Sequence, residues 1–144
     1  ATAAISGAGG LVKDGNGVLN LNIGSTYSGP TMVSAGTLVV NNESGSATGA
    51  GLVTLGSGAL LAGNGTIGGS VAVIDGTIAP GNSPGTLAIG ESLTLDSLSL
   101  LDFELDASDQ TVGSGVNDLV TIGSDLILDG TLDVTSSPLS VGTW

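Results

Sequence analysis

The stretch Gly51–Thr86 reads GLVTLGSGALLAGNGTIG and then GSVAVIDGTIAPGNSPGT, so its apolar pattern and its turn residues repeat after 18 positions. Self-similarity at a fixed period is typical of stacked architectures, in which one repeat cannot bury its apolar face alone. We therefore predict coils stacked on one another. The lag aligns Val53 with Val71, Leu55 with Val73, Gly58 with Gly76, Leu60 with Ile78, and Gly63-Asn64 with Gly81-Asn82.

The composition around this stretch predicts an ordered β protein. Glycine supplies 26 of 144 residues, more than twice its usual share of about 7%, and charged residues make up only 10%. The hydrophobic content of 40% argues against disorder, because disordered chains are poor in aliphatic residues. Small residues alternate with Val, Leu and Ile, which suits a half-buried pleated surface.

The net charge of -12 is concentrated in the C-terminal part of the chain. Residues 1–90 contain three acids and Lys13, the single cation, whereas residues 91–144 contain the other ten acids. This charge argues against nucleic acid and anionic membranes as partners, because both are bound through several Lys or Arg side chains. No apolar run approaches the roughly 18 residues of a membrane span, so no membrane insertion by this segment is expected.

Short segments in which apolar residues occur at every second position are bounded by Gly, Asn, Ser or Asp, and they predict many strands of three to five residues. The Gly-free run Glu91–Val112 also has apolar residues two apart, so we expect strands and corners there and keep a helix as the alternative. A Gly-Thr-aliphatic triplet recurs, in which Gly relieves a corner, Thr begins a strand and the aliphatic side chain enters the core. The triplets begin at Gly36, Gly65, Gly76, Gly85 and Gly130.

Two architectures use many short strands. A sandwich or barrel has longer strands joined by hairpin turns, whereas a parallel β-solenoid has coils of roughly 20 residues. The 18-residue lag and the brevity of the strands favour a parallel β-helix of about seven coils. With a rise of ~4.8 Å per coil, it would be roughly 35 Å long. Residues 1–144 are expected to form a single segment of a longer protein, with an acidic loop near 106–117.

Four stretches of the chain have the residue pattern of one known type of repeat. The stretch Tyr27–Asn42 reads YSGPTMVSAGTLVVNN, and Ser6–Gly29 extends the pattern upstream. Gly63–Leu95 and Asp118–Val134 continue it downstream. Together these stretches resemble the passenger-associated repeat of autotransporters, and the resemblance covers nearly the whole chain. Met32 departs from it, because a second Thr is common at that position.

The resemblance implies a right-handed parallel β-helix on the passenger of a Gram-negative bacterium, exported to the cell surface by type V secretion. We therefore expect a non-catalytic extracellular segment with a structural or adhesin role. The first alternative is a self-assembling fibre or matrix subunit that stacks through open solenoid ends, since no capping helix or charged plug is evident. The second is a carbohydrate-active β-helix enzyme. The partners considered are a second copy and a cell-surface or glycan ligand.

No catalytic residue is assigned from the sequence. The chain has no His and no Cys, which removes the usual general base and the thiol nucleophile. Two carboxylates can hydrolyse a glycosidic bond, and Asp102, Glu104 and Asp106 alternate on one strand face. We interpret these acids as the solvated face of a half-buried strand.

No metal site or cofactor is predicted either. The candidate calcium ligands are Asp106, Asp109, Asn117 and Asp118. Their spacing matches neither an EF-hand nor the nonapeptide of a calcium-binding β-roll, so we interpret them as part of a solvated loop. The turns 63–65 and 81–85 lack the Lys and the helix of a phosphate loop. The recurring Thr residues form no Thr-x-Thr array that would bind ice.

Overall fold

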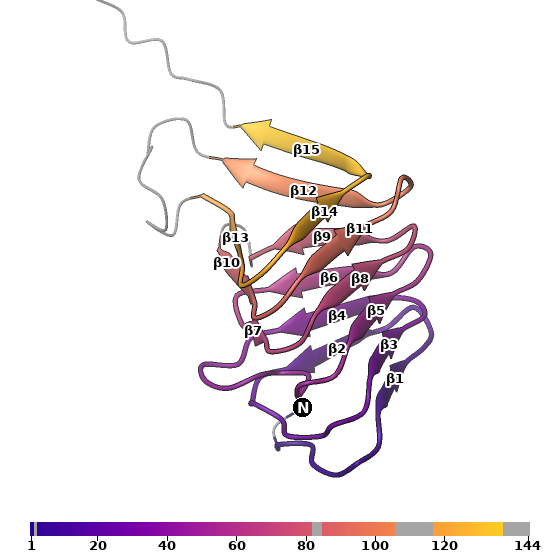
Figure 1. Cartoon of the computed structure of the whole chain (residues 1–144), viewed down its shortest axis with the longest axis vertical. Coiled ribbons are helices and arrows are strands. Elements are labelled where there is room, and N and C mark those ends of the chain that lie inside the picture. The colour runs from indigo at the N-terminus through magenta and orange to yellow at the C-terminus, as the bar shows by residue number, and fades with distance from the viewer. Residues whose placement is uncertain (2, 82–84, 106–116, 137–144) are drawn as a thin grey trace, which may run out of the picture.

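The computed structural model describes residues 1, 3–81, 85–105 and 117–136. These residues form strands and no helix, so none of them belongs to a helix that could span a membrane. Figure 1 shows the strands stacked in tiers from the N-terminal to the C-terminal end. They are β1 (Leu11–Lys13), β2 (Val18–Leu21), β3 (Thr31–Val33), β4 (Thr37–Val40), β5 (Val53–Leu55), β6 (Leu60–Gly63), β7 (Thr66–Ile67), β8 (Val71–Val73), β9 (Thr77–Pro80), β10 (Thr86–Ile89), β11 (Leu93–Leu95), β12 (Leu100–Leu105), β13 (Leu119–Ile122), β14 (Leu126–Leu128) and β15 (Thr131–Ser136).

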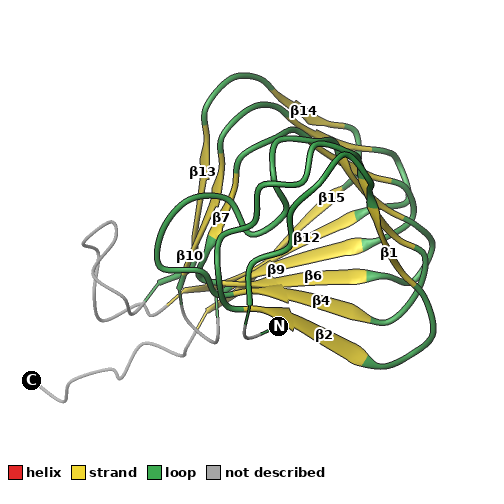
Figure 2. Cartoon of the chain, turned by 90° about the horizontal axis from the view of Figure 1, so that it is seen from below, coloured by secondary structure: helices red, strands yellow, loops and turns green. Residues whose placement is uncertain are grey.

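The strands form three parallel sheets around one axis (Figure 2). Sheet A has the order β1-β3-β5-β8-β11-β14, sheet B has β2-β4-β6-β9-β12-β15, and sheet C has β13-β10-β7. Each coil adds one strand to sheet A and one to sheet B, and coils three to five also add one to sheet C. The expected parallel β-helix is confirmed. The described residues make six coils, where about seven were expected.

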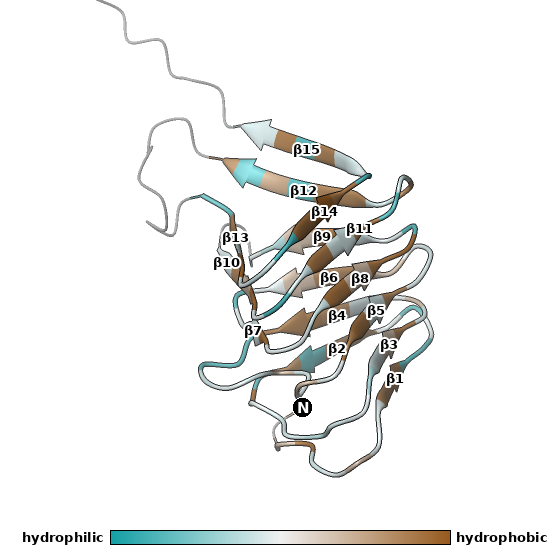
Figure 3. Cartoon of the chain, viewed as in Figure 1, coloured by the Kyte–Doolittle hydropathy of each residue, from teal (hydrophilic) through white to brown (hydrophobic). Residues whose placement is uncertain are grey.

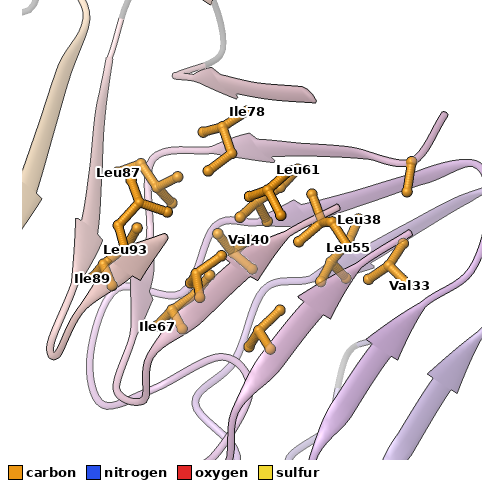
Figure 4. Packing of buried hydrophobic residues seen from close by; sticks show 14 of the residues in the cluster. Val33, Leu38, Val40, Leu55, Leu61, Ile67, Ile78, Leu87, Ile89 and Leu93 are labelled. Atoms are coloured by element: carbon orange, nitrogen blue, oxygen red, sulfur yellow. The ribbon is translucent and has the colours of Figure 1, made fainter. Parts of the chain in front are cut away.

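The core consists of columns in which each side chain lies above its equivalent in the previous coil. In sheet A, Val53, Val71 and Leu93 are in register and buried. In sheet B, Leu61 and Ile78 are paired in the same way. Figure 4 shows Leu61, Ile78 and Leu93 among the side chains packed between the sheets, and Figure 3 shows apolar residues in the strands of every tier. Full burial of each side chain stabilises the fold by about 1.5–3 kcal/mol.

The predicted lag of 18 residues is correct in sheet A and wrong by one residue in sheet B. Val53 pairs with Val71 as predicted, but Leu61, and not Leu60, pairs with Ile78. The cause is the corner between the sheets, which spans residues 56–59 in the third coil and only 74–76 in the fourth. Because a one-residue shift reverses the face of every side chain, Leu61 is buried and Leu60 is not.

The turn residues follow the same shift. Gly58 and Asp75 have φ values of 70° and 55°, and the Gly58 amide donates a hydrogen bond of 2.8 Å to the Asp75 carbonyl. The left-handed corner position is therefore shared by Gly58 and Asp75, and the predicted equivalence of Gly58 with Gly76 is wrong. At the end of β6, Gly63 is in register with Pro80, and it also forms an isolated bridge with Gly81, the residue with which the 18-residue lag aligns it. The next strand, β7, pairs with β10 at a lag of 22 residues, as in Thr66 with Ala88.

The Gly-Thr-aliphatic triplet begins a strand at each of its five places, as predicted, and its aliphatic residue enters the core at four of them. The threonines are the first residues of β4, β7, β9, β10 and β15. The aliphatic residue is buried in four of them, and Leu132 of the last coil is the exception, at 49% exposed. The triplet opens strands of both sheet B and sheet C, so it marks a corner of the solenoid and not one particular sheet.

The Gly-free run forms strands where the structure describes it. Leu93–Leu95 and Leu100–Leu105 are β11 and β12, and the corner between them carries the exposed Leu98. The helix alternative is therefore wrong for residues 91–105. Residues 106–112, and the predicted acidic loop except Asn117, lie outside the described residues.

The two ends of the solenoid differ. Lys13 in the first coil is in register with Val33 and is buried. Its ammonium donates hydrogen bonds of 2.6 and 2.9 Å to the carbonyls of Gly15 and Ala35, so its aliphatic stem lies in the core while its charge holds a corner. The last coil instead exposes the aliphatic side chains of β14.

Candidate functional site

The candidate catalytic acids Asp102 and Glu104 lie on the outer face of β12. Leu101 is buried and Phe103 packs against the core, so the two acids point away from it, as the alternation predicts. Asp102 is in register with Asp133 of β15, and adjacent strands lie ~4.8 Å apart. Two like charges therefore sit side by side on the outer face of sheet B. Asp106, the third candidate, lies outside the described residues.

A hollow of about 240 Å³ lies beside these acids. Carboxylates two residues apart on a strand are separated by ~6.6 Å along it, which approaches the spacing of an inverting glycosidase pair. The acid of such a pair needs an apolar environment, whereas Glu104 is exposed to water. Among the residues that the structure describes, the lining contains no aromatic or basic side chain that could hold a sugar. It consists of Ala62, Ala79, Pro80, Gly81, Asp102, Glu104 and Asp118.

Asp118, a candidate calcium ligand that we interpreted as part of a solvated loop, binds the backbone instead, so the solvated interpretation is wrong for this residue. It is 8% exposed, and its carboxylate oxygens accept hydrogen bonds of 2.9 Å from the Gly85 amide and 2.7 Å from the Glu104 amide. Asn117 also has an interaction within the protein. Asp106 and Asp109 lie outside the described residues. No group of three or more acidic, His or Cys side chains suited to a metal ion occurs in the part of the chain that the structure describes.

Acids at the corner between sheets A and B link three successive coils. The Ser57 hydroxyl donates to the Asp75 carboxylate at 2.5 Å, and the Asp75 amide donates to the Asp96 carboxylate at 3.1 Å. The Ser99 hydroxyl donates to the same oxygen of Asp96 at 2.6 Å. The Ser99 hydrogen bond, followed by that of the Asp75 amide, holds the pKa of Asp96 below its usual value. These acids support the stack.

The Gly-rich turns also serve the stack. The Asn42 side-chain carbonyl accepts a hydrogen bond of 2.9 Å from the Thr66 amide, and that of Asn41 accepts one of 3.1 Å from the Asn64 amide. A Cβ atom at Gly63 would lie 2.1 Å from the Val40 carbonyl oxygen, so only glycine fits there. The threonines of the triplets are divided between sheets B and C and form no single plane.

A second hollow, of about 340 Å³, was not found from the sequence. It lies beside the first two coils, whose segments between sheet B and sheet A form no strand of sheet C. Tyr27 is buried at this place, and its hydroxyl shares a hydrogen bond with that of Thr31. Burial raises the pKa of the Tyr27 phenol. Hydroxyl side chains and glycines surround the hollow: Ser25, Thr26, Tyr27, Ser28, Ser46, Gly49, Ala50 and Gly68.

Comparison with known proteins gives a consistent result. The passenger-associated-transport-repeat family matches residues 11–40, which comprise β1 to β4. Over 140 residues, or 94% of this chain, the sequence is 44% identical to the adhesin BmaC autotransporter of Brucella suis. Over 101 residues, or 70% of the chain, it is 37% identical to an extracellular serine protease of Serratia marcescens. No solved structure matches significantly.

These matches cover only 4% of the adhesin and 9% of the protease. The family match ends at Val40, the last residue of β4. The resemblance seen in the sequence is therefore confirmed, and with it an extracellular or surface-exposed location. The chain is a β-helical segment that carries the passenger-associated-transport repeat of autotransporter passengers.

Proposed function

We propose that this segment is a non-catalytic scaffold of a surface-exposed passenger, with a structural or adhesin role. The observation that carries this proposal is the uninterrupted register of sheets A and B through six coils. The acids that the sequence offered for chemistry fit this role where they are described. Asp118 binds backbone amides, and Asp102 lies beside another carboxylate.

The two relatives support the same proposal. One is called an adhesin and the other a serine protease, yet both contain a segment similar to this one. A segment shared by proteins with different activities is better explained by architecture than by catalysis. An adhesin role for this chain rests on the first relative, to which the identity is higher.

The test combines a binding assay and a hydrolysis assay on the purified 144-residue protein. We expect adhesion to host cells or immobilised glycans without cleavage of polysaccharides or peptides. The matched variant is Asp102→Asn/Glu104→Gln, which removes both outward charges of β12 and leaves the strand intact. Any glycan cleavage that the double variant abolishes would contradict the proposal and favour the carbohydrate-active alternative.

A second candidate function, end-to-end assembly into fibres, is favoured by the last coil. Leu126 and Leu132 are about half exposed there, and strands at the edge of a sheet offer unpaired backbone groups. Contacts between unlike ends of a solenoid would continue into a filament. Sedimentation velocity and electron microscopy over a range of concentrations distinguish the two. Single rods of roughly 29 Å, six coils of ~4.8 Å, would exclude the fibre.

A further inference from the structure

The fifth coil is longer than the four coils before it, but its strands remain in register. From Leu93 in β11 to Leu126 in β14 the chain advances 33 residues, 11 more than the 22 between Val71 and Leu93. On either side of the extra length, β12 pairs with β15 along six residues and β13 pairs with β10 along four. The stack therefore accommodates the additional residues without shifting.

Asp118 and Glu104 lie at the two points where the extra length leaves and rejoins the coil. The Asp118 amide donates to the Glu104 carbonyl at 2.9 Å, and the Glu104 amide donates to the Asp118 carboxylate at 2.7 Å. The two residues are thus joined in both directions. The two hydrogen bonds hold Glu104 and Asp118 next to each other, independently of the residues between them.

The same carboxylate also connects the fifth coil to the fourth. Its second oxygen accepts the Gly85 amide at 2.9 Å, and the next residue, Leu119, donates its amide to the Gly85 carbonyl at 2.9 Å. Gly85 directly precedes β10, the strand on which β13 stacks. Hydrogen bonds to a carboxylate are about twice as strong as those between neutral groups. The Asp118 side chain is also largely excluded from water.

We propose that Asp118 is a clasp that joins the chain at Glu104 to the chain at Asp118, so that the length and sequence between these two points can vary while the coils remain stacked. The free-energy cost of closing a loop grows only slowly with its length, which makes variation tolerable once the ends are held. Segments carried on a rigid scaffold are common sites of binding. Asp118 is a positioning residue, and its clasp would act equally in a catalytic or a non-catalytic chain.

The test exchanges residues 106–116 for Gly-Ser linkers of different lengths, one shorter and one about twice as long, with Asp118 kept. We expect Tm to change by no more than roughly 3 °C in either direction. In the natural sequence, Asp118→Ala is expected to lower Tm by roughly 5–15 °C and to raise amide exchange at Gly85 and Glu104 at least about tenfold. Asp129→Ala, an exposed acid of the neighbouring coil, is the control and should change neither quantity.

The conservative variant Asp118→Asn keeps the proposal testable if the alanine variant does not fold. The Asn side chain accepts a hydrogen bond through its single carbonyl and presents an amide to the other donor. We expect faster exchange at one of the two amides and a smaller decrease in Tm. The proposal is overturned if either linker unfolds the protein while Asp118 is present, or if the Asp118 variants exchange at Gly85 and Glu104 like the control. Both of these outcomes leave the proposed non-catalytic function untouched, because that proposal is tested by the hydrolysis assay.

Discussion

The fifth and sixth coils carry the same sequence pattern in different surroundings. Leu93 and Leu95 of β11 are in register with Leu126 and Leu128 of β14. The first two are 0% exposed, whereas the latter are 50% and 38% exposed. Within the described residues β14 is the last strand of sheet A, so nothing in that sheet covers its far side. Burial in this fold is therefore supplied by the next coil, and stability is expected to depend on nearest neighbours.

The largest predicted effect comes from replacing, one at a time, two leucines that are in register in the fifth and sixth coils. Leu95→Ala removes a fully buried side chain and is expected to lower the free energy of unfolding by about 2–5 kcal/mol. Leu128→Ala removes the equivalent side chain where it is partly in water, and should cost about 1 kcal/mol or less. Urea denaturation of the two variants measures the difference. Equal effects would contradict the nearest-neighbour account.

A second prediction compares equivalent glycines of the first and last coils. Gly17 and Gly130 both precede the first residue of a sheet B strand. A Cβ atom at Gly130 would lie 2.4 Å from the Ser99 carbonyl oxygen of the coil beneath, but at Gly17 it would meet nothing within 4 Å. Gly130→Ala should destabilise the protein by about 1–3 kcal/mol.

Gly17→Ala is the matched control and should be neutral or stabilising by up to about 1 kcal/mol. Thermal melting of both variants provides the measurement. If both glycines tolerate alanine equally, the sixth coil does not fit as closely on the fifth as the structure indicates.

A third prediction concerns alkaline pH at the opposite end of the stack. Burial raises the pKa of Tyr27, so the neutral phenol stabilises the folded state. This contribution is complete below the unfolded pKa of about 10 and is lost as pH rises through the higher folded value. At pH 7, Tyr27→Phe should cost about 1 kcal/mol through the lost hydrogen bond to Thr31. Denaturation from pH 7 to pH 11 should show the variant and the natural protein converging, and a constant gap would contradict the assignment.

The smallest predicted effect is electrostatic and belongs to the interface between the fifth and sixth coils. Asp102 and Asp133 are paired like charges, and Asp133→Asn should stabilise the protein by a few tenths of a kcal/mol, up to about 1. The gain should disappear in about 1 M NaCl, where exposed charges are screened. Melting curves at two salt concentrations test this, with Glu43→Gln in the second coil as the control. A gain that persists at high salt would exclude repulsion as its cause.

Strand starts and inward faces were predictable because they follow local rules. Alternation with a period of two assigns Val71 and Val73 to one face, and the Gly-Thr-aliphatic triplets place Thr77 and Thr86 at strand starts. These features need only a few neighbouring residues. The 18-residue lag also placed Val53 correctly on Val71.

The remaining features depend on contacts that no local pattern encodes. The register of Leu61 with Ile78 arises because the corner before Ile78 is shorter by one residue. An alignment of repeats of equal length cannot detect such a difference. The Asp118 carboxylate binds an amide 33 residues earlier in the chain, so the sequence shows only an acid beside a polar loop. The burial of Lys13 likewise depends on the Ala35 carbonyl of the next coil.

Amide hydrogen exchange along the 144-residue chain tests the central claim most directly, because it measures how much each coil is protected by the coils on either side. We predict the slowest exchange in β3, β5, β8 and β11, which have a neighbouring strand on both sides in sheet A. Exchange in β14 and β15 should be at least about tenfold faster, although their sequences follow the same pattern. Uniform protection from β5 to β15, or maximal protection in β14, would contradict a solenoid in which each coil is stabilised by the next.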